Sequence, residues 1–283
     1  AIGNSEFVCS SWAPRMGSAC HSGACSGSTT CANACRATQD RSSCSSIRER
    51  RDEHVFANGA RYTGEWLTDV RDGYGVQVWN DGARYEGQWL NDKAHGIGRF
   101  HHSCGDVYEG GWYCDKAHGQ GTYQHRDGSK YVGTWRDDKQ EGEGCEEWPD
   151  GAKYQGQYCG GRKNGSGRFV WCDRSTFQGV FVDNDMHGRG IYTWEDGRIF
   201  EGEWLKNRMH GHGIYRWADG RIYDGEYKDD QKDGYGVFRW PDGRCYEGQW
   251  RNGRQHGTAL YFDPRCGKRT GTWEDGRRIC WLD

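Results

Sequence analysis

The chain has 283 residues and a formal net charge of −3, and it contains 45 glycines, 15 tryptophans and 16 tyrosines. Few aliphatic side chains accompany them, which excludes a helical bundle, a doubly wound α/β enzyme and a TIM barrel; collagen is excluded because glycine does not recur at every third position. No stretch approaches the roughly 18 apolar residues of a membrane-spanning helix. We therefore expect a core built of aromatic rings and glycines.

Residues 1–54 have a composition of their own, with many serines and few large apolar residues. Such a segment buries too little apolar surface to fold, which predicts a low-complexity or disordered segment. Two alternatives stay open for its six cysteines: an S-acylated segment that carries lipid, and a zinc site, although no Cys-x-x-Cys pair is present. These cysteines are Cys9, Cys20, Cys25, Cys31, Cys35 and Cys44.

Residues 55–283 form a second region that repeats with a period of 23 residues and no insertion. A fixed period of this length is typical of repeat architectures. The period predicts about nine full repeats and a degenerate C-terminal repeat that starts at Arg269. An aromatic-x-Gly-x-aromatic pattern starts each full repeat, at Tyr62, Tyr85, Tyr108, Tyr131, Tyr154, Phe177, Phe200, Tyr223 and Tyr246.

Two strands are expected in each repeat. Tyr62, Gly64 and Trp66 share parity and therefore face the same way in a strand, as do Gly73 and Gly75 of the Gly-x-Gly pair that follows. Asp-Gly dipeptides such as 81–82 then predict hairpin turns, because glycine accepts a positive φ. The expected fold is all-β: an elongated, single twisted antiparallel sheet of tandem hairpins, with a polar opposite face.

The central glycines of the aromatic pattern are expected to be structural. A glycine on the neighbouring strand gives a flat floor on which a ring can lie, so that large and small residues fill the layer together. The glycines are Gly64, Gly87, Gly110, Gly133, Gly156, Gly179, Gly202, Gly225, Gly248 and Gly271.

These residues resemble the MORN repeat (membrane occupation and recognition nexus). Residues 85–89, 95–98 and Phe100 carry the family pattern of Tyr-x-Gly-x-Trp, His-Gly-x-Gly and a further aromatic residue. The resemblance extends from Phe56 to Asp283, with a departure at Ala259, where a glycine is usual. It implies a row of β-hairpins with an aromatic groove, and scaffolding in cytoskeletal, ciliary or membrane-contact assemblies.

Signs of chemistry are weak. His95, His118 and their counterparts recur at one position, but neighbouring repeats are two strands or about 9.6 Å apart, too far for two of them to bind one zinc ion. No phosphate-binding loop, nucleophile elbow or kinase motif is present. We expect no catalytic residues, no metal and no cofactor. Because the charges are balanced, we also expect no nucleic-acid binding and at most weak contact with anionic lipid.

The function that we expect is that of a non-enzymatic scaffold or adaptor that binds a protein partner through the aromatic groove. Alternatives are a peripheral phosphoinositide-binding module, or the regulatory part of a larger enzyme such as a phosphatidylinositol phosphate kinase. We expect a reduced, cytoplasmic environment, because the cysteines show no disulfide framework, and end strands that can pair two copies end to end. Trp135, Trp194 and Trp217 are expected to keep an exposed edge. The groove residues are predicted to be Tyr131, Trp135, Tyr154, Trp171, Trp194, Trp204 and Trp217.

Overall fold

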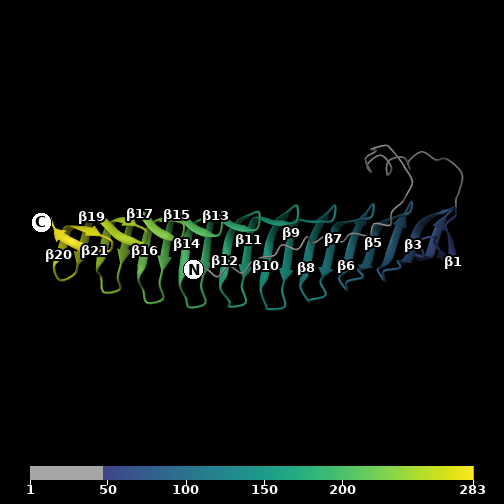
Figure 1. Ribbon diagram of the computed structural model, residues 1–283, viewed down its shortest axis with the longest axis horizontal. Coiled ribbons are helices and arrows are strands. Elements are labelled where there is room, and N and C mark those ends of the chain that lie inside the picture. The colour runs from purple at the N-terminus through teal and green to yellow at the C-terminus, as the bar shows by residue number, and fades with distance from the viewer. Residues whose placement is uncertain (1–46, 283) are drawn as a thin grey trace, which may run out of the picture. The chain divides into compact units, whose positions relative to one another are not determined.

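The computed structural model describes residues 47–282. The chain divides into an N-terminal unit, up to Glu146, and a C-terminal unit from Glu147. In Figure 1 the strands of the first are drawn in purple to teal and those of the second in green to yellow. The prediction of disorder covers residues 1–54. Residues 1–46, which include the six N-terminal cysteines, lie outside the described residues, whereas residues 49–54 belong to a strand. The sheet begins at Glu49, a few residues before the expected boundary at residue 55.

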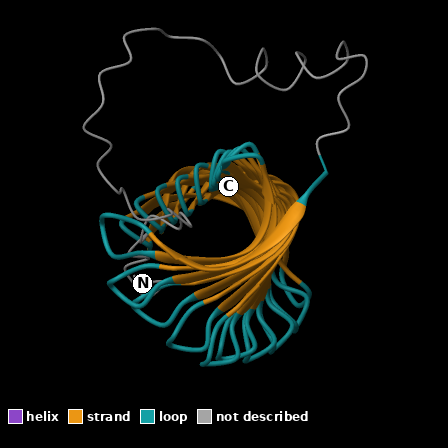
Figure 2. Cartoon of the chain, turned by 90° about the vertical axis from the view of Figure 1, so that its right-hand side faces the viewer, coloured by secondary structure: helices purple, strands orange, loops and turns teal. Residues whose placement is uncertain are grey.

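The described residues contain strands, turns and loops but no helix (Figure 2). The N-terminal strands are β1 (Glu49–Val55), β2 (Arg61–Leu67), β3 (Val70–Val78), β4 (Arg84–Leu90), β5 (Lys93–His101), β6 (Val107–Tyr113), β7 (Lys116–Gln124), β8 (Lys130–Arg136) and β9 (Lys139–Glu147). The C-terminal strands are β10 (Lys153–Cys159), β11 (Arg162–Val170), β12 (Thr176–Val182), β13 (Asp185–Thr193), β14 (Ile199–Leu205), β15 (Arg208–Arg216), β16 (Ile222–Lys228), β17 (Gln231–Arg239), β18 (Cys245–Arg251), β19 (Arg254–Asp263), β20 (Gly267–Glu274) and β21 (Arg277–Trp281).

Each strand pairs in antiparallel fashion with its neighbours in the sequence, for example β3 with β4 and β15 with β16. Over the residues described, the first and last strands of a unit do not pair, so neither unit closes into a barrel. The prediction of an all-β fold of tandem antiparallel hairpins is therefore confirmed. This prediction rested on the alternation of rings and glycines along each strand, because a pattern with a period of two residues gives a strand one buried and one exposed face.

The two glycines of the Gly-x-Gly pair have different roles. Gly98 lies opposite Gly87 in the sheet, and a Cβ on Gly98 would overlap the ring of Tyr85, which lies across both residues. Gly96 instead has a φ of +65° and lies at a bulge, where the register between β4 and β5 shifts. Along the same strand, one glycine thus provides the floor for a ring and the other lies at the bulge.

Tyr85 shows how the rings form the core. Its ring centroid lies 5.0 Å from that of Trp89 and 5.2 Å from that of Trp112 in the next repeat, and both pairs are T-shaped. The Tyr85 hydroxyl donates to the Gln88 carbonyl at 2.9 Å, and Trp112 Nε1 donates to the Gly98 carbonyl at 3.0 Å. Aromatic pairs of this geometry contribute about 0.5–1.5 kcal/mol each beyond the area that they bury.

Two-residue turns within the repeats provide a contact that the sequence did not reveal. Asn91 and Asp92 have φ values of 48° and 66°, as a type I′ turn requires. Asp92 Oδ1 accepts from the Arg71 amide at 2.8 Å, and the Asp92 amide donates to the Arg71 carbonyl at 2.9 Å. We call this pair of bonds to the preceding repeat the turn clasp. It recurs in the pairs Asp115–Ala94, Asp138–Ala117, Asn184–Lys163, Asn207–Met186 and Asp230–Met209.

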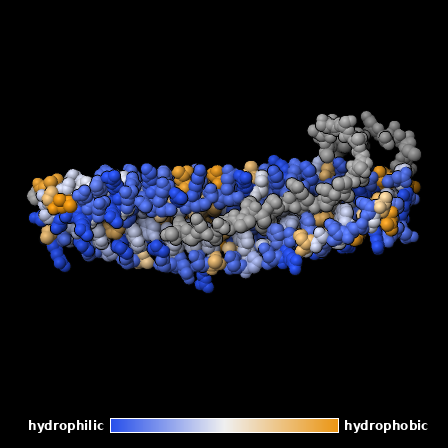
Figure 3. All heavy atoms as spheres, in the orientation of Figure 1, coloured by the Kyte–Doolittle hydropathy of each residue, from blue (hydrophilic) through white to orange (hydrophobic). Residues whose placement is uncertain are grey.

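The opposite face of the strands is largely hydrophilic on the side visible in Figure 3. In the C-terminal unit isoleucines interrupt this polar face. Ile199 and Ile222 both lie opposite Arg216 across the sheet, and Ile222 also lies opposite Arg239, so apolar and basic side chains alternate there. Isolated aliphatic side chains between charges are compatible with a solvated sheet face.

We expect the turn clasp to contribute measurably to local stability. In an Asn207→Gly variant the buried Met186 amide loses its acceptor while the turn keeps a residue that tolerates positive φ. An unsatisfied buried donor costs about 1–3 kcal/mol, so hydrogen exchange at the Met186 amide should accelerate roughly ten-fold or more. Asn252→Gly is the matched control, because Asn252 has a φ of 47° in an equivalent turn. Equal exchange at Met186 in both variants would contradict the clasp.

Candidate functional site

Four of the seven predicted groove residues belong to the core. Tyr131 and Trp135 of the N-terminal unit are 0 % and 1 % exposed, and Tyr154 and Trp204 of the C-terminal unit are 0 % and 2 % exposed. The prediction that Trp135 keeps an exposed edge is wrong. Its ring lies 5.3 Å from Tyr108 and 5.1 Å from Tyr131, so both neighbouring rings cover it.

The other three predicted residues lie in the C-terminal unit and are only half-buried. Trp171, Trp194 and Trp217 occupy one repeat position, just after a second strand, and Trp148 and Trp240 occupy the same position in the repeats before and after them. We call these five residues the outer tryptophan row. They are the rings of this unit that are both repeated and partly accessible, whereas the core rings are not accessible to a partner.

Buried rings connect the members of this row. Tyr192 lies between Trp171 and Trp194, with centroid distances of 5.1 and 4.5 Å. Tyr215 lies in the same way between Trp194 and Trp217, at 5.2 and 4.4 Å. Because these inner rings are 4 % and 7 % exposed, the tryptophans rise above a buried aromatic layer. The result is an alternation of exposed and buried rings across the strands.

An arginine and an aspartate hold three of the tryptophans in place. The Arg198 guanidinium lies 5.2 Å from the Trp194 ring centroid and pairs with Asp196 at 2.7 Å. Arg198 also donates to the Tyr215 hydroxyl at 3.2 Å. The side-chain hydrogen bond from Arg198 lowers the pKa of the exposed Asp196. The same arrangement recurs with Arg221 on Trp217 and Asp219, and with Arg244 on Trp240 and Asp242.

The N-terminal unit has a different set of residues at this position. Trp79 is followed by His102 and His125, so the apolar row is interrupted there. Burial lowers the pKa of His102. Asp106 accepts from the Tyr123 hydroxyl at 2.8 Å and contacts His125 Nδ1 at 3.0 Å. In the N-terminal unit, polar and ionisable groups therefore occupy the position at which the C-terminal unit has a continuous apolar surface.

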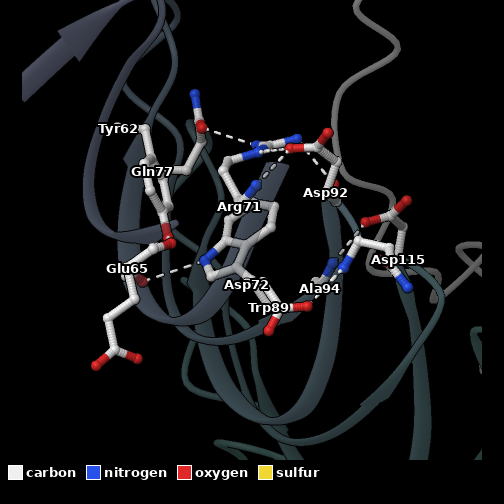
Figure 4. Close-up of polar contacts among 11 residues, drawn as sticks. Tyr62, Glu65, Arg71, Asp72, Gln77, Trp89, Asp92, Ala94 and Asp115 are labelled. Carbon is white, nitrogen blue, oxygen red and sulfur yellow. Dashed lines mark hydrogen bonds and ion pairs between the residues drawn. The ribbon is translucent and has the colours of Figure 1, made fainter. Parts of the chain in front are cut away.

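A second repeat position lies directly beneath the rings. Its residue type differs between repeats more than that of any other buried position. In Figure 4 Arg71 extends between Gln77 and Asp92. It donates to Gln77 Oε1 at 2.9 Å and to Asp92 Oδ1 at 3.0 Å, and its guanidinium lies 4.1 Å from the Trp89 ring centroid. We call the equivalent residues the variable column; they are Arg71, Ala94, Ala117, Gln140, Lys163, Met186, Met209, Lys232 and Gln255.

Lys232 shows the strongest perturbation in this column. Its ammonium lies 4.8 Å from the centroids of Trp217, Phe238 and Trp250 and 4.9 Å from that of Tyr223. Burial lowers the pKa of Lys232 to about 8. The attraction of an ammonium to ring faces opposes this shift, because it favours the charged form. No carboxylate pairs with Lys232 among the described residues, so the four rings take the place of a counter-ion.

Among the described residues, no group of three or more His, Cys, Asp or Glu side chains could hold a metal ion. No helix long and apolar enough to cross a membrane is present in the described part of the chain. The cation–aromatic contacts of the variable column and the outer tryptophan row are thus the most distinctive features of the buried and accessible ring surfaces.

The sequence profile of the MORN repeat matches nine segments: residues 62–84, 85–106, 108–130, 131–153, 154–176, 177–197, 200–220, 223–243 and 246–264. The chain belongs to the MORN-repeat family. This confirms the resemblance seen in the sequence, and it makes the protein a repeat scaffold. Each matched segment begins at the ring that lies on a glycine floor.

Other comparisons are distant. No curated protein matches the chain in sequence. Among solved structures, the TCP domain of SAS-4 from Drosophila melanogaster, in complex with a proline-rich motif of Ana2, is 13 % identical with a TM-score of 0.28, over 75 % of this chain and 96 % of that one. An inactive virginiamycin B lyase from Staphylococcus aureus is 10 % identical with a TM-score of 0.16, over 80 % of this chain and 85 % of that one.

Sequence reasoning missed Trp240, Lys232 and the aspartate–arginine pairs. A signal for them was present, since Trp-x-Asp-Gly-Arg recurs at 194–198 and 217–221, and Trp240 continues it with the same spacing. Parity alone placed Trp204 and Trp217 on the same face, yet one is core and the other half-buried. The difference depends on the neighbouring repeat: Phe177 and Tyr192 of the preceding repeat cover Trp204, with centroid distances of 5.5 and 5.9 Å, whereas Trp217 lies just beyond the end of its strand.

We expect the buried charge of Lys232 to make stability depend on pH. Because its folded pKa lies below that of the unfolded chain, the unfolded state binds more protons above about pH 8, and stability rises with pH up to the unfolded value of 10.5. Relative to the Lys232→Met variant, the free energy of unfolding of the parent protein should rise by about 1–2 kcal/mol between pH 7.5 and 9.5. Methionine is chosen because Met186 and Met209 occupy the equivalent position in other repeats. Parallel urea-denaturation curves at each pH measure this difference. Identical pH dependence of the two proteins would contradict it.

Proposed function

We propose that this MORN-repeat protein is a non-enzymatic scaffold or adaptor, and that it binds a protein partner through the outer tryptophan row. The observation that carries the proposal is the partial exposure of five equivalent tryptophans in one unit. Large rings that are half-buried and held by neighbours are the groups that contribute most to protein interfaces. Arg198 and its counterparts add charge and donors at the edge of the row, which suits a protein surface.

The cellular setting belongs to the same proposal. The family resemblance supports a cytoplasmic scaffold in a cytoskeletal, ciliary or membrane-contact assembly. Pairing of end strands between two copies stays a prediction, as does the alternative in which the repeats regulate a larger enzyme. Neither alternative has a described residue that favours it over partner binding by the outer tryptophan row.

The proposal is tested with a double variant, Trp194→Leu with Trp217→Leu. Leucine keeps apolar packing against Tyr192 and Tyr215 but removes the raised indole rings. Partners captured from the source cell and identified by mass spectrometry should be lost, because truncation of aromatic anchors commonly costs about 2 kcal/mol or more. The thermal melting curve of the variant should stay close to that of the parent protein.

The matched control is Val182→Ala with Leu205→Ala, which removes apolar surface that is 38 % exposed at each residue in the same unit. This control should keep the partners. Loss of the partners in the control, or their retention in the tryptophan variant, would contradict the assignment of the binding surface. Loss of the fold in the tryptophan variant would show instead that the row is part of the core.

Contact with anionic lipid is expected to be weak. Several turn cations pair with an acidic residue of the next repeat: Lys116 with Asp137 at 3.7 Å, and Arg208 with Asp229 at 3.6 Å. Paired charges attract a membrane less than a basic cluster does. Vesicles that contain phosphatidylinositol bisphosphate should therefore pellet the protein only at low salt, since salt screens exposed charges. Binding that persists at physiological salt would favour the phosphoinositide-binding alternative.

A further inference from the structure

The outer tryptophan row has a spacing that restricts what can lie along it. Equivalent residues of adjacent repeats are two strands apart, which is about 9.6 Å at ~4.8 Å per strand. The row crosses the strands of the sheet instead of following them. A ligand that lies along the row therefore cannot add a strand to the sheet, and it must satisfy its own backbone groups in another way.

Three regular peptide conformations can be compared with this spacing. Two turns of an α-helix advance about 10.8 Å, so the mismatch with the row reaches about 3.6 Å after three steps. Three residues of a β-strand advance about 10 Å, but residues three apart point to opposite faces. One turn of a polyproline II helix takes three residues and advances about 9.3 Å, and it returns to the same face with a mismatch of only about 1 Å after three steps.

The polar groups of the row also suit this conformation. A polyproline II helix has no internal hydrogen bonds, so its carbonyl groups need donors. The indole N–H groups of Trp194, Trp217 and Trp240 donate to no acceptor within the part of the chain that the structure describes. Arg198 and Arg221 lie beside the same rings, with centroid distances of 5.2 and 5.3 Å. Rings to pack on and donors to bond therefore recur together, once per helical turn.

We propose that the ligand of the outer tryptophan row is a proline-rich segment in the polyproline II conformation, with one turn of three residues on each of its tryptophans, from Trp148 to Trp240. This inference rests on the proposed function, because it names the ligand class of the same surface. Preformed polyproline II segments lose little conformational entropy on binding, and aromatic-lined grooves are a known way to bind them. Five tryptophans at three residues each match a segment of about fifteen residues, of which a twelve-residue peptide covers four tryptophans.

The test measures binding of fluorescein-labelled oligoprolines to the full chain by fluorescence anisotropy. Dodecaproline, the peptide of twelve prolines, should bind. The affinity should fall several-fold with each loss of three residues, to nonaproline and then hexaproline, because each turn contacts one more tryptophan. An alternating Gly-Ser peptide of the same length as dodecaproline should not bind. Absence of dodecaproline binding at millimolar protein, or equal affinity for dodecaproline and the Gly-Ser peptide, would overturn the inference.

Variants locate the site. Trp194→Leu with Trp217→Leu should weaken dodecaproline binding at least ten-fold, and Trp194→Phe with Trp217→Phe should weaken it less, since phenylalanine keeps a ring but removes the N–H donor. Trp79→Leu is the matched control. Trp79 has the same repeat position but lies in the N-terminal unit, where His102 occupies that position in the next repeat. This variant should bind dodecaproline as the parent protein does. Equal binding by all variants would overturn the inference.

If cellular partners depend on the row while dodecaproline does not bind, the proposed function holds and the polyproline assignment fails.

Discussion

The contact on which this structure depends is that of a ring with a pair of facing glycines. Gly87 and Gly98 come together across two strands, and Tyr85 lies flat over both, where any side chain would overlap it. The ring then has two edges left for the tryptophans of its own and the next repeat. Each repeat buries its apolar surface only against its neighbours, so the hairpins are stable as an array and not singly.

The turn clasp extends the same dependence to the backbone. Asp92 bonds both the amide and the carbonyl of Arg71, a residue of the preceding repeat, and so aligns successive hairpins at one end. The residue that receives the clasp is also the member of the variable column. Its side chain is free to differ between repeats because the clasp uses only its main chain. Ala94, Arg71 and Lys163 can therefore occupy equivalent places without changing the sheet.

The two units differ in the residues at the positions that can vary without changing the sheet. The C-terminal unit keeps an apolar outer row, with Trp194 and Trp217 above buried tyrosines, and places Lys232 among four rings. The N-terminal unit has His102 and the Asp106–Tyr123 hydrogen bond instead. Identical frameworks thus present an apolar, partly accessible surface in one unit and an ionisable one in the other. In the proposed function, binding specificity comes from the outer tryptophan row, since the core rings are not accessible to a partner.

The sequence by itself determined the period, the two strands per repeat, the face that carries rings and glycines, and the family. These follow from local alternation and from a register that contains no insertion, so each can be read from one repeat. Only the tertiary structure decided that Trp135 and Trp204 are core while Trp194 and Trp217 are half-buried, that Asn207 bonds Met186, and that Lys232 lies among four rings. Those properties depend on contacts between residues one repeat apart. Parity gives the face of a side chain, but the neighbouring hairpin sets how deeply that side chain is covered.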